Sequence, residues 1–164
     1  MGSVVEIVMG SDSDLPVMEE TGKVLKEFKI PYVLRIISAH RTPDLAREYS
    51  KGLIKRGVKV VIAGAGAAAH LAGAIASCTT IPVIGVPLDS SPLSGIDALF
   101  STVQMPGGIP VATMAIGKAG AKNAAIFAVE ILALENNRLK NALKNFRGKM
   151  AKEVANKDKR LKQI

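Results

Sequence analysis

The chain has 164 residues, of which 48% are hydrophobic and 4% aromatic, with a formal net charge of +8. This length suits one domain with a sizeable core. No apolar run reaches the roughly 20 residues that span a bilayer, and the N-terminus enters a strand pattern without the features of a signal peptide. A single cysteine, Cys78, excludes an intramolecular disulfide and a cysteine-rich metal site. We therefore expect a globular cytoplasmic protein without a membrane partner.

The positive charge is confined to the end of the chain. Ten Lys and Arg residues follow Asn137, against only Glu153 and Asp158, whereas the acids and bases before them balance. A nucleic-acid interface would combine basic residues with aromatic side chains or a known motif, and the body of the chain offers neither. We predict no nucleic-acid partner and interpret the basic tail as a solvated helix face.

The first predicted unit is a buried strand followed by a helix. Residues 4–9 form a β-branched run that ends at Gly10. A polar loop then leads into a helix expected over residues 15–29, with Asp14 as its N-cap and a proline in its first turn. A second strand is predicted over residues 32–38.

The second strand ends in the corner Ser-Ala-His-Arg-Thr-Pro, residues 38–43. Thr42 is expected to cap a helix that extends to residue 56. The core face of this helix is expected to hold Leu45, Tyr49, Leu53 and Ile54. Backbone N–H groups at a helix N-terminus bind anions, and this corner places His40 beside Arg41. The local pattern allows two roles for His40, as a proton-transfer group or as a residue that only caps or packs the corner.

Strands and helices continue to alternate along the rest of the body. Three more strands are expected, over residues 58–63, 82–86 and 110–116. Two more helices are expected, over residues 71–77 and 119–134. The segment 88–110 is the least regular part, with an amphipathic patch near residues 97–104. This alternation predicts a parallel sheet with helices on both faces. Ligands bind outside the carboxyl ends of such strands, where the loop after the first strand, the His40 corner and the corner at residues 64–70 should meet.

The tail carries an amphipathic helical pattern. Apolar side chains recur at spacings of four, three, four and four, at Leu139, Leu143, Phe146, Met150 and Val154. This spacing predicts a helix with one apolar stripe and a basic outer face. We divide the chain into an α/β domain, residues 1–135, and a C-terminal helix, residues 136–164. The stripe is expected to dock on a neighbouring subunit.

The strand-end corners could hold a phosphorylated, nucleotide-sized ligand. The loop at residues 10–14 offers backbone N–H and serine donors for a phosphate and a carboxylate for a ribose hydroxyl pair, although it lacks the glycine spacing of a Walker or dinucleotide loop. The glycines of residues 64–66 permit close approach of a ligand, or equally a tight helix–strand contact. Two histidines and one cysteine, unclustered, make no transition-metal site. His40 suits proton transfer near neutral pH.

Six segments together resemble the N5-carboxyaminoimidazole ribonucleotide mutase family. They are residues 9–14, 38–43, 63–66, 68–71, 82–87 and 104–108. The similarity covers residues 4–134 in order. It implies a flavodoxin-like, three-layer fold with strand order 2-1-3-4-5, and a homo-octameric enzyme of purine (IMP) biosynthesis. Such an enzyme moves the carboxyl group of a small ribonucleotide from nitrogen to carbon, without a metal or another cofactor.

The resemblance also implies roles for the corner residues. His40 matches the family's general acid/base, and His70 matches a histidine that lines the same cleft. Substrate-binding positions are matched by Ser11, Ser13, Asp14, Ser38, Arg41, Gly64, Ala65 and Gly66. The chain departs from the family at Ala67 and Ala72, where glycine and proline are usual. An alanine at position 67 could reduce turnover if the backbone there requires a positive φ.

Two other interpretations stay open on the sequence alone. One is a related carboxylase that uses aminoimidazole ribonucleotide and carbon dioxide; Arg41 and the corner at residues 64–70 resemble the mutase branch instead. The other is a nucleotide-binding regulator in which His40 is a structural cap and the basic tail binds RNA. Strongly salt-dependent RNA binding that is lost with the tail would indicate the regulator.

Overall fold

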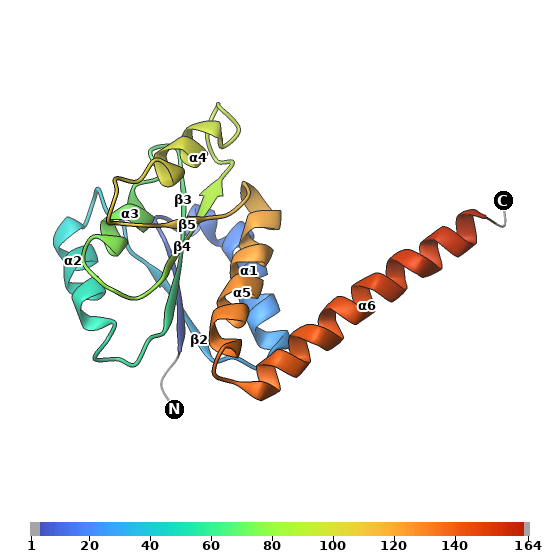
Figure 1. The fold of residues 1–164 in the computed structure, drawn as a ribbon. Helices are drawn as coiled ribbons and strands as arrows, with labels where there is room; N and C mark the ends of the chain where they lie inside the picture. Colours follow the sequence, from blue (N-terminus) through green and yellow to red (C-terminus); the bar gives the residue numbers. More distant parts are fainter. Residues whose placement is uncertain (1–3, 163–164) are drawn as a thin grey trace. The chain divides into compact units, whose positions relative to one another are not determined.

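The computed structural model describes residues 4–162 of the chain, as alternating strands and helices (Figure 1). The elements are β1 (Val5–Met9), α1 (Leu15–Glu27), β2 (Tyr32–Ile36), α2 (Pro43–Gly52), β3 (Val60–Gly66), α3 (Leu71–Ala76), β4 (Val83–Leu88), α4 (Ile96–Val103), β5 (Ala112–Thr113), α5 (Gly117–Ala133) and α6 (Asn137–Leu161). A short 3-10 turn, Asp12–Asp14, precedes α1. The chain divides into two compact units, Met1–Ala128 and Val129–Ile164.

The first unit is built on a five-stranded parallel sheet. The strand order is β2-β1-β3-β4-β5, which confirms the expected order 2-1-3-4-5. β1 pairs with both β2 and β3, so that Val5 lies opposite Tyr32 and Val60. All five residues of β1 are buried because helices cover both faces of the sheet. In Figure 1, α1 and α5 lie on one face and α2 and α3 on the other.

The second helix is shorter than the sequence predicts, and its buried face differs. α2 ends at Gly52 instead of residue 56, and Gly57 completes the following turns with φ +77°. Tyr49 and Leu53 are buried as expected, but Leu45 and Ile54 are 43% and 63% exposed. Both exposed residues were wrongly predicted to face the core. Leu45 is exposed because the buried face of α2 is formed by Ala46, Tyr49 and Ser50. Ile54 is exposed because it lies beyond the end of the helix.

The largest differences from the sequence prediction lie at the end of β3 and in the segments after β4. The irregular segment contains a helix, α4, whose Ile96, Phe100 and Val103 remain exposed. β5 comprises only Ala112–Thr113, where the sequence predicts seven residues of strand. β3 extends to Gly66, so that the small residues expected in a corner are the end of the strand. Each difference concerns a segment rich in glycine or proline, where apolar periodicity is interrupted.

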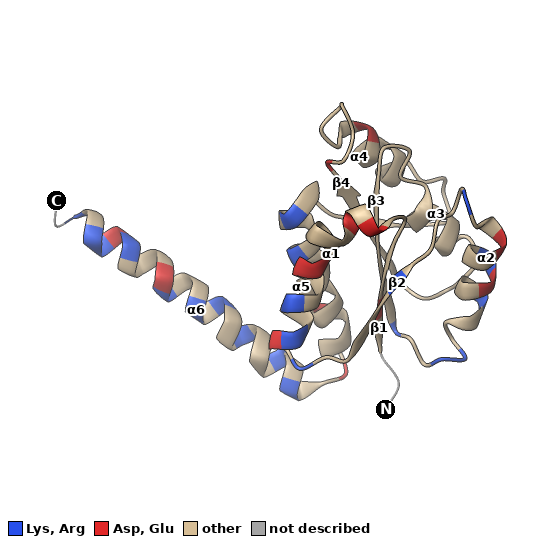
Figure 2. Ribbon diagram, turned by 180° about the vertical axis from the view of Figure 1, so that it is seen from behind, with Lys and Arg blue, Asp and Glu red and all other residues tan. Residues whose placement is uncertain are grey.

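The second unit contains the end of α5 and the long helix α6. The 25 residues of α6 confirm the predicted C-terminal helix. The helix begins at Asn136, whose side-chain oxygen accepts a hydrogen bond from Leu139 N at 3.2 Å. Figure 2 shows Lys and Arg along α6, and within this unit Arg147 pairs with Glu130 at 2.6 Å. Among residues 4–162, no helix is long and apolar enough to cross a membrane.

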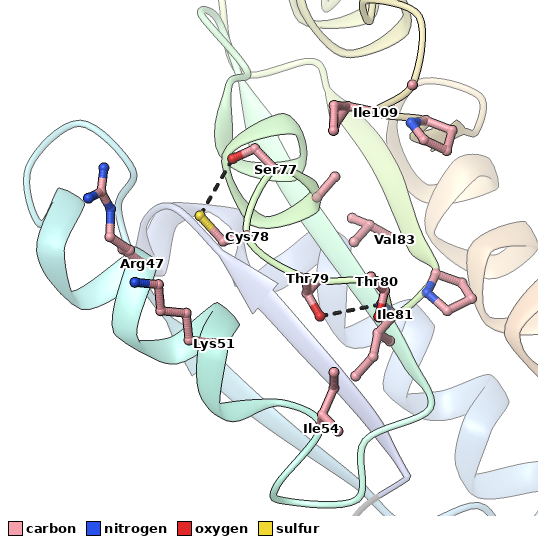
Figure 3. Close-up of a pocket in the computed structure, with 14 residues that line it drawn as sticks. Arg47, Lys51, Ile54, Ser77, Cys78, Thr79, Thr80, Ile81, Val83 and Ile109 are labelled. Atoms are coloured by element: carbon pink, nitrogen blue, oxygen red, sulfur yellow. Dashed lines mark hydrogen bonds between the residues drawn. The ribbon is translucent and has the colours of Figure 1, made fainter.

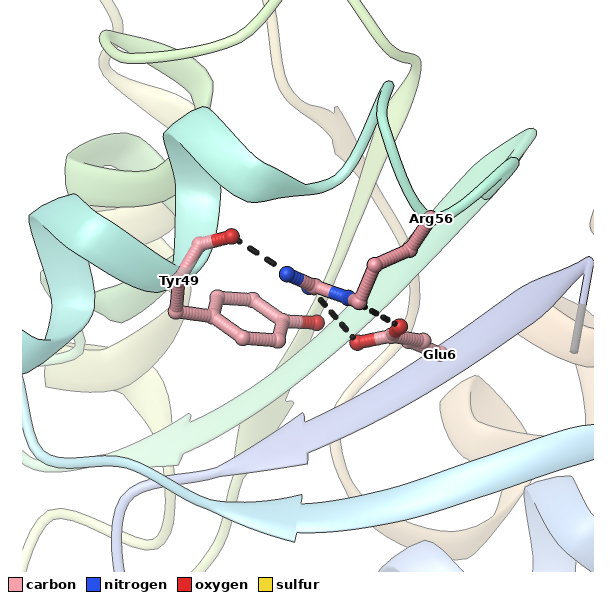
Figure 4. A network of polar contacts seen from close by, with 3 residues as sticks. All are labelled: Glu6, Tyr49 and Arg56. Carbon is pink, nitrogen blue, oxygen red and sulfur yellow. Dashed lines mark hydrogen bonds and ion pairs between the residues drawn. The ribbon is translucent and has the colours of Figure 1, made fainter. Parts of the chain in front are cut away.

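An ion pair with a buried carboxylate connects β1 to the turns that follow α2 (Figure 4). Glu6, 4% exposed, accepts two hydrogen bonds from Arg56, at 3.0 Å from Nε and 3.2 Å from Nη2. The Arg56 guanidinium lies 4.9 Å from the centre of the Tyr49 ring. Burial, and the Glu6 carboxylate beside it, raise the pKa of the Tyr49 phenol well above its usual value. Arg56 therefore neutralises the buried Glu6 carboxylate.

Replacing Arg56 should destabilise the fold. We expect Arg56→Met to lower the free energy of unfolding by about 1–3 kcal/mol, because it leaves the buried Glu6 carboxylate without its partner. Urea denaturation measures the change. The matched control is Arg47→Met on α2, which removes an exposed arginine. The double variant Glu6→Gln with Arg56→Met should regain most of the loss, and equal stability of Arg56→Met and the control would contradict the role of the pair.

Candidate active site

The carboxyl ends of β1, β2 and β3 surround a cavity of about 370 Å³. It is lined by Gly10, Ser11, Ser13, Asp14, Ser38, Ala39, His40, Arg41, Ala65, Gly66, Ala67, Ala68, His70, Leu71 and Ser90. Nine of the ten candidate site residues named from the sequence are in this lining. The exception is Gly64, which is buried in β3 against Met18 of α1, where a Cβ would overlap the Met18 sulfur. Because Gly64 has no side chain, α1 can pack closely against β3 at this position.

The first corner folds on itself through its own polar groups. Asp14 Oδ2 accepts a hydrogen bond from Ser11 N at 3.1 Å, and Ser11 Oγ accepts one from Ser13 N at 3.3 Å. These two bonds close a capping box around the 3-10 turn. Asp14 occupies the predicted N-cap position of α1, but its side chain makes no capping bond to that helix. Burial raises the Asp14 pKa, although the Ser11 and Gly10 N–H groups and Arg41 act in the opposite direction.

Arg41 joins the first two corners. Its Nη2 donates to the carbonyl oxygen of Gly10 at 2.7 Å, and its Nε donates to Ser38 Oγ at 3.3 Å. Thr42 occupies the predicted N-cap position of α2, but its hydroxyl donates to the Ser38 carbonyl at 2.8 Å and makes no capping bond. The corner at residues 38–43 is thus closed by its own side chains. The Arg41 guanidinium is held at the cavity, and its remaining N–H groups can still bind an anion.

The two histidines of the chain meet in the cavity. His40 Nε2 lies 2.9 Å from His70 Nδ1, and the rings stand almost perpendicular, at 88°. One nitrogen must donate and the other accept, so the bond couples the tautomer of one ring to that of the other. Both side chains are exposed at the cavity. Such a pair can take up and pass on a proton next to a bound molecule.

The third corner presents His70 through a strained turn. Ala67 has φ +51°, in the left-handed region that disfavours side chains. The backbone then turns tightly, with Ala69 N donating to Ala67 O at 2.9 Å and His70 N donating to Ala68 O at 2.8 Å. The position therefore does require a positive φ, the condition under which an alanine could reduce turnover.

Removing the Ala67 methyl should relieve this strain. We expect Ala67→Gly to raise the free energy of unfolding by up to about 1 kcal/mol, because the cost of a left-handed alanine exceeds the added entropy of glycine in the unfolded chain. Ala67→Val should lower it by about 1–2 kcal/mol. Urea denaturation of the two variants checks the order. A glycine variant less stable than the valine variant would contradict the strained geometry.

One cavity residue escaped the sequence interpretation. Ser90 follows the carboxyl end of β4 and lines the cavity, where its side chain lies so close to Gly66 that a Cβ on the glycine would overlap it. The only available signal was its position four residues after a predicted parallel strand, residues 82–86. Among residues 4–162 there is no cluster of three or more His, Cys, Asp or Glu side chains that could hold a metal ion.

Comparison with known families and sequences places this cavity in context. Residues 4–153 match the family model described as AIR carboxylase. The chain is 54% identical over 161 residues to the N5-carboxyaminoimidazole ribonucleotide mutase of Pyrococcus horikoshii, covering 98% of this chain and 90% of the relative. It is also 54% identical to the mutase of Thermotoga maritima over 160 residues, covering 98% of this chain and 92% of that one.

Solved structures agree with the fold. The crystal structure of Treponema denticola PurE superposes with a TM-score of 0.87 at 30% identity, covering 96% of this chain and 97% of the other. The Treponema denticola PurE2-S38D structure gives a TM-score of 0.89 at 30% identity, covering 98% and 99%. The sheet that places the three corners is therefore shared with these proteins along almost the whole chain.

Proposed function

The chain belongs to the AIR carboxylase family, and we propose that it interconverts N5-carboxyaminoimidazole ribonucleotide and 4-carboxy-5-aminoimidazole ribonucleotide in purine biosynthesis. The enzyme is an isomerase, in agreement with the mutase name of its relatives. The observation that carries the finer assignment is the His40–His70 contact at 2.9 Å inside a cavity bordered by an arginine and two serine-bearing loops. It combines a proton carrier with an anion site.

We assign the proton transfers to His40. The N–carboxyl bond breaks to release carbon dioxide, and His40 gives a proton to the departing nitrogen. The ring carbon then attacks the carbon dioxide, and His40 removes the proton that this carbon loses, which returns the imidazole to its starting state. His70 supports the cycle because its hydrogen bond sets the tautomer of His40. Keeping carbon dioxide beside the ring makes the addition effectively intramolecular, an advantage of up to about 7–11 kcal/mol.

The first two corners suit the ribose phosphate. Arg41 is positioned by Gly10 and Ser38, and the hydroxyls of Ser11 and Ser13, 2.9 Å apart, belong to the same cavity lining. Charge-assisted bonds to phosphate in this place would supply binding energy remote from the reacting carboxyl group. Asp14 is less free to bind a ribose, because one carboxylate oxygen accepts from Ser11 N.

The route of the carboxyl group tests the mutase assignment. Substrate labelled in the N-carboxyl group, converted in unlabelled bicarbonate, should give a product that retains most of the label, because trapped carbon dioxide adds faster than it escapes. Mass spectrometry of the product measures the retention. Complete loss of label, with efficient use of aminoimidazole ribonucleotide and bicarbonate, would identify a carboxylase instead. The histidine pair and the phosphate corners would serve either reaction.

We further propose a homo-octamer in which the helix of residues 136–164 docks on a neighbouring subunit. The support is the apolar stripe of α6, where Met150, Val154 and Leu161 are 51%, 67% and 71% exposed. Apolar side chains repeated along one helix face are costly to leave in water. The octamer itself rests on resemblance to the mutase family.

A further inference from the structure

A second, larger hollow lies apart from the histidine pair. Its volume is about 880 Å³, and it is formed by α2, the loop between α3 and β4, and the segment before β5 (Figure 3). None of its fourteen lining residues is shared with the lining of the histidine cavity, and the proposed reaction uses none of them. Its size is within the range of small-molecule pockets.

The polar side chains that line this hollow are two cations and several hydroxyl groups. Arg47 and Lys51, one turn apart on α2, are both exposed and have no ion-pair partner in the described part of the chain. From the loop, Thr79 Oγ1 accepts a bond from Ile81 N at 3.3 Å, which leaves its hydroxyl proton available, and Thr80 adds a second hydroxyl. No Asp or Glu is in the lining. The polar groups therefore select for an anion.

The rest of the hollow is apolar. Figure 3 shows Val83 and Ile109 across from the two cations of α2, with Ile54 below them. Ile54, two residues after the end of α2, is 63% exposed, whereas Val83 is buried. An exposed isoleucine next to unpaired cations suits a molecule that has an apolar body and a charged head.

We propose that this hollow binds a small amphipathic organic anion, with its phosphate, sulfate or carboxylate head on Arg47 and Lys51 and its apolar body on Ile54, Val83 and Ile109. The carboxyl-transfer site needs neither group, so the two sites are separate. The contact of a single anionic head with two cations accounts for selectivity over an uncharged molecule of equal size.

The fluorescent anion 8-anilinonaphthalene-1-sulfonate tests this with the full-length protein. We expect the fluorescence of the probe to increase and to saturate. The double variant Arg47→Gln with Lys51→Gln should bind the probe at least about tenfold more weakly, because each charge-assisted hydrogen bond contributes to the binding free energy. The matched control removes two exposed charges elsewhere, by Lys26→Gln with Lys118→Gln, and should bind like the unmodified chain. Carboxyl-transfer activity should be equal in all three proteins.

Competition separates the two halves of the ligand. Hexyl phosphate should displace the probe, whereas inorganic phosphate and hexanol should displace it at least about tenfold less well. Equal probe binding by the Arg47/Lys51 variant and the control would overturn the proposal. So would absence of enhancement with the unmodified chain, which is the result expected if another copy of the chain covers the hollow.

Discussion

The His40→Asn variant is expected to fold and bind nucleotide normally while its turnover falls by at least about 10²-fold, the usual scale for loss of a general acid/base. Asparagine retains a side-chain N–H that can donate toward His70 Nδ1, so the corner keeps a polar contact in place of the 2.9 Å bond. What it cannot do is take up and return a proton. Single-turnover kinetics with N5-carboxyaminoimidazole ribonucleotide separates this chemical defect from binding.

His70→Asn is the matched comparison, because it removes the other ring of the same pair. It should reduce turnover less than His40→Asn and should also change the pH dependence of turnover, since the remaining histidine loses the partner that sets its tautomer. Unchanged turnover in His40→Asn would return His40 to the role of a structural cap. A larger loss in His70→Asn than in His40→Asn would exchange the two assignments.

Ending the chain after Ala142 is expected to reduce the size of the assembly while the sheet unit stays folded. This end point keeps the Asn136 cap and the buried side chain of Leu139, and removes the exposed part of the stripe. Light scattering should show a lower mass, and circular dichroism should show that only the deleted helix is lost. An assembly of unchanged subunit number would remove the docking proposal.

Substitutions within α6 show whether the assembly depends on the apolar stripe or only on the length of the helix. Met150→Ser with Val154→Ser disrupts the stripe, and we expect it to lower the assembly mass as the truncation does. Lys152→Ser with Lys159→Ser, on the opposite face, should leave the mass unchanged. If the lysine pair alone were required, charge instead of apolar burial would hold the assembly together.

The layers of the fold were accessible from the sequence because buried parallel strands carry unbroken apolar runs. β1 and β4 were expected to within about two residues on this basis. α4 was less accessible, because its apolar residues face outward and the helix begins at Gly95, with φ +85°, where no ordinary capping residue marks its start. The length of β5 was overestimated, because within the predicted range, residues 110–116, only Ala112 and Thr113 pair with β4.

The candidate site was predictable by location but not in its contacts. Parallel topology brings the strand ends together, which places His40 and His70 at one edge of the sheet. Their ring-to-ring bond depends on side-chain rotation across 30 residues of separation, and on the left-handed turn at Ala67. The preference of Asp14 and Thr42 for bonds inside their own corners likewise depends on backbone geometry that residue type alone does not specify.

The position of β1 between β2 and β3 affects how the protein acquires activity during synthesis. β1 is made first, yet it must accept β2 on one side and β3 on the other before Gly10, Arg41 and His70 can surround one cavity. A growing chain shorter than 70 residues lacks the second histidine. Pairings between distant parts of a chain form slowly, so the return of carboxyl transfer after dilution from denaturant should lag behind the return of helix signal.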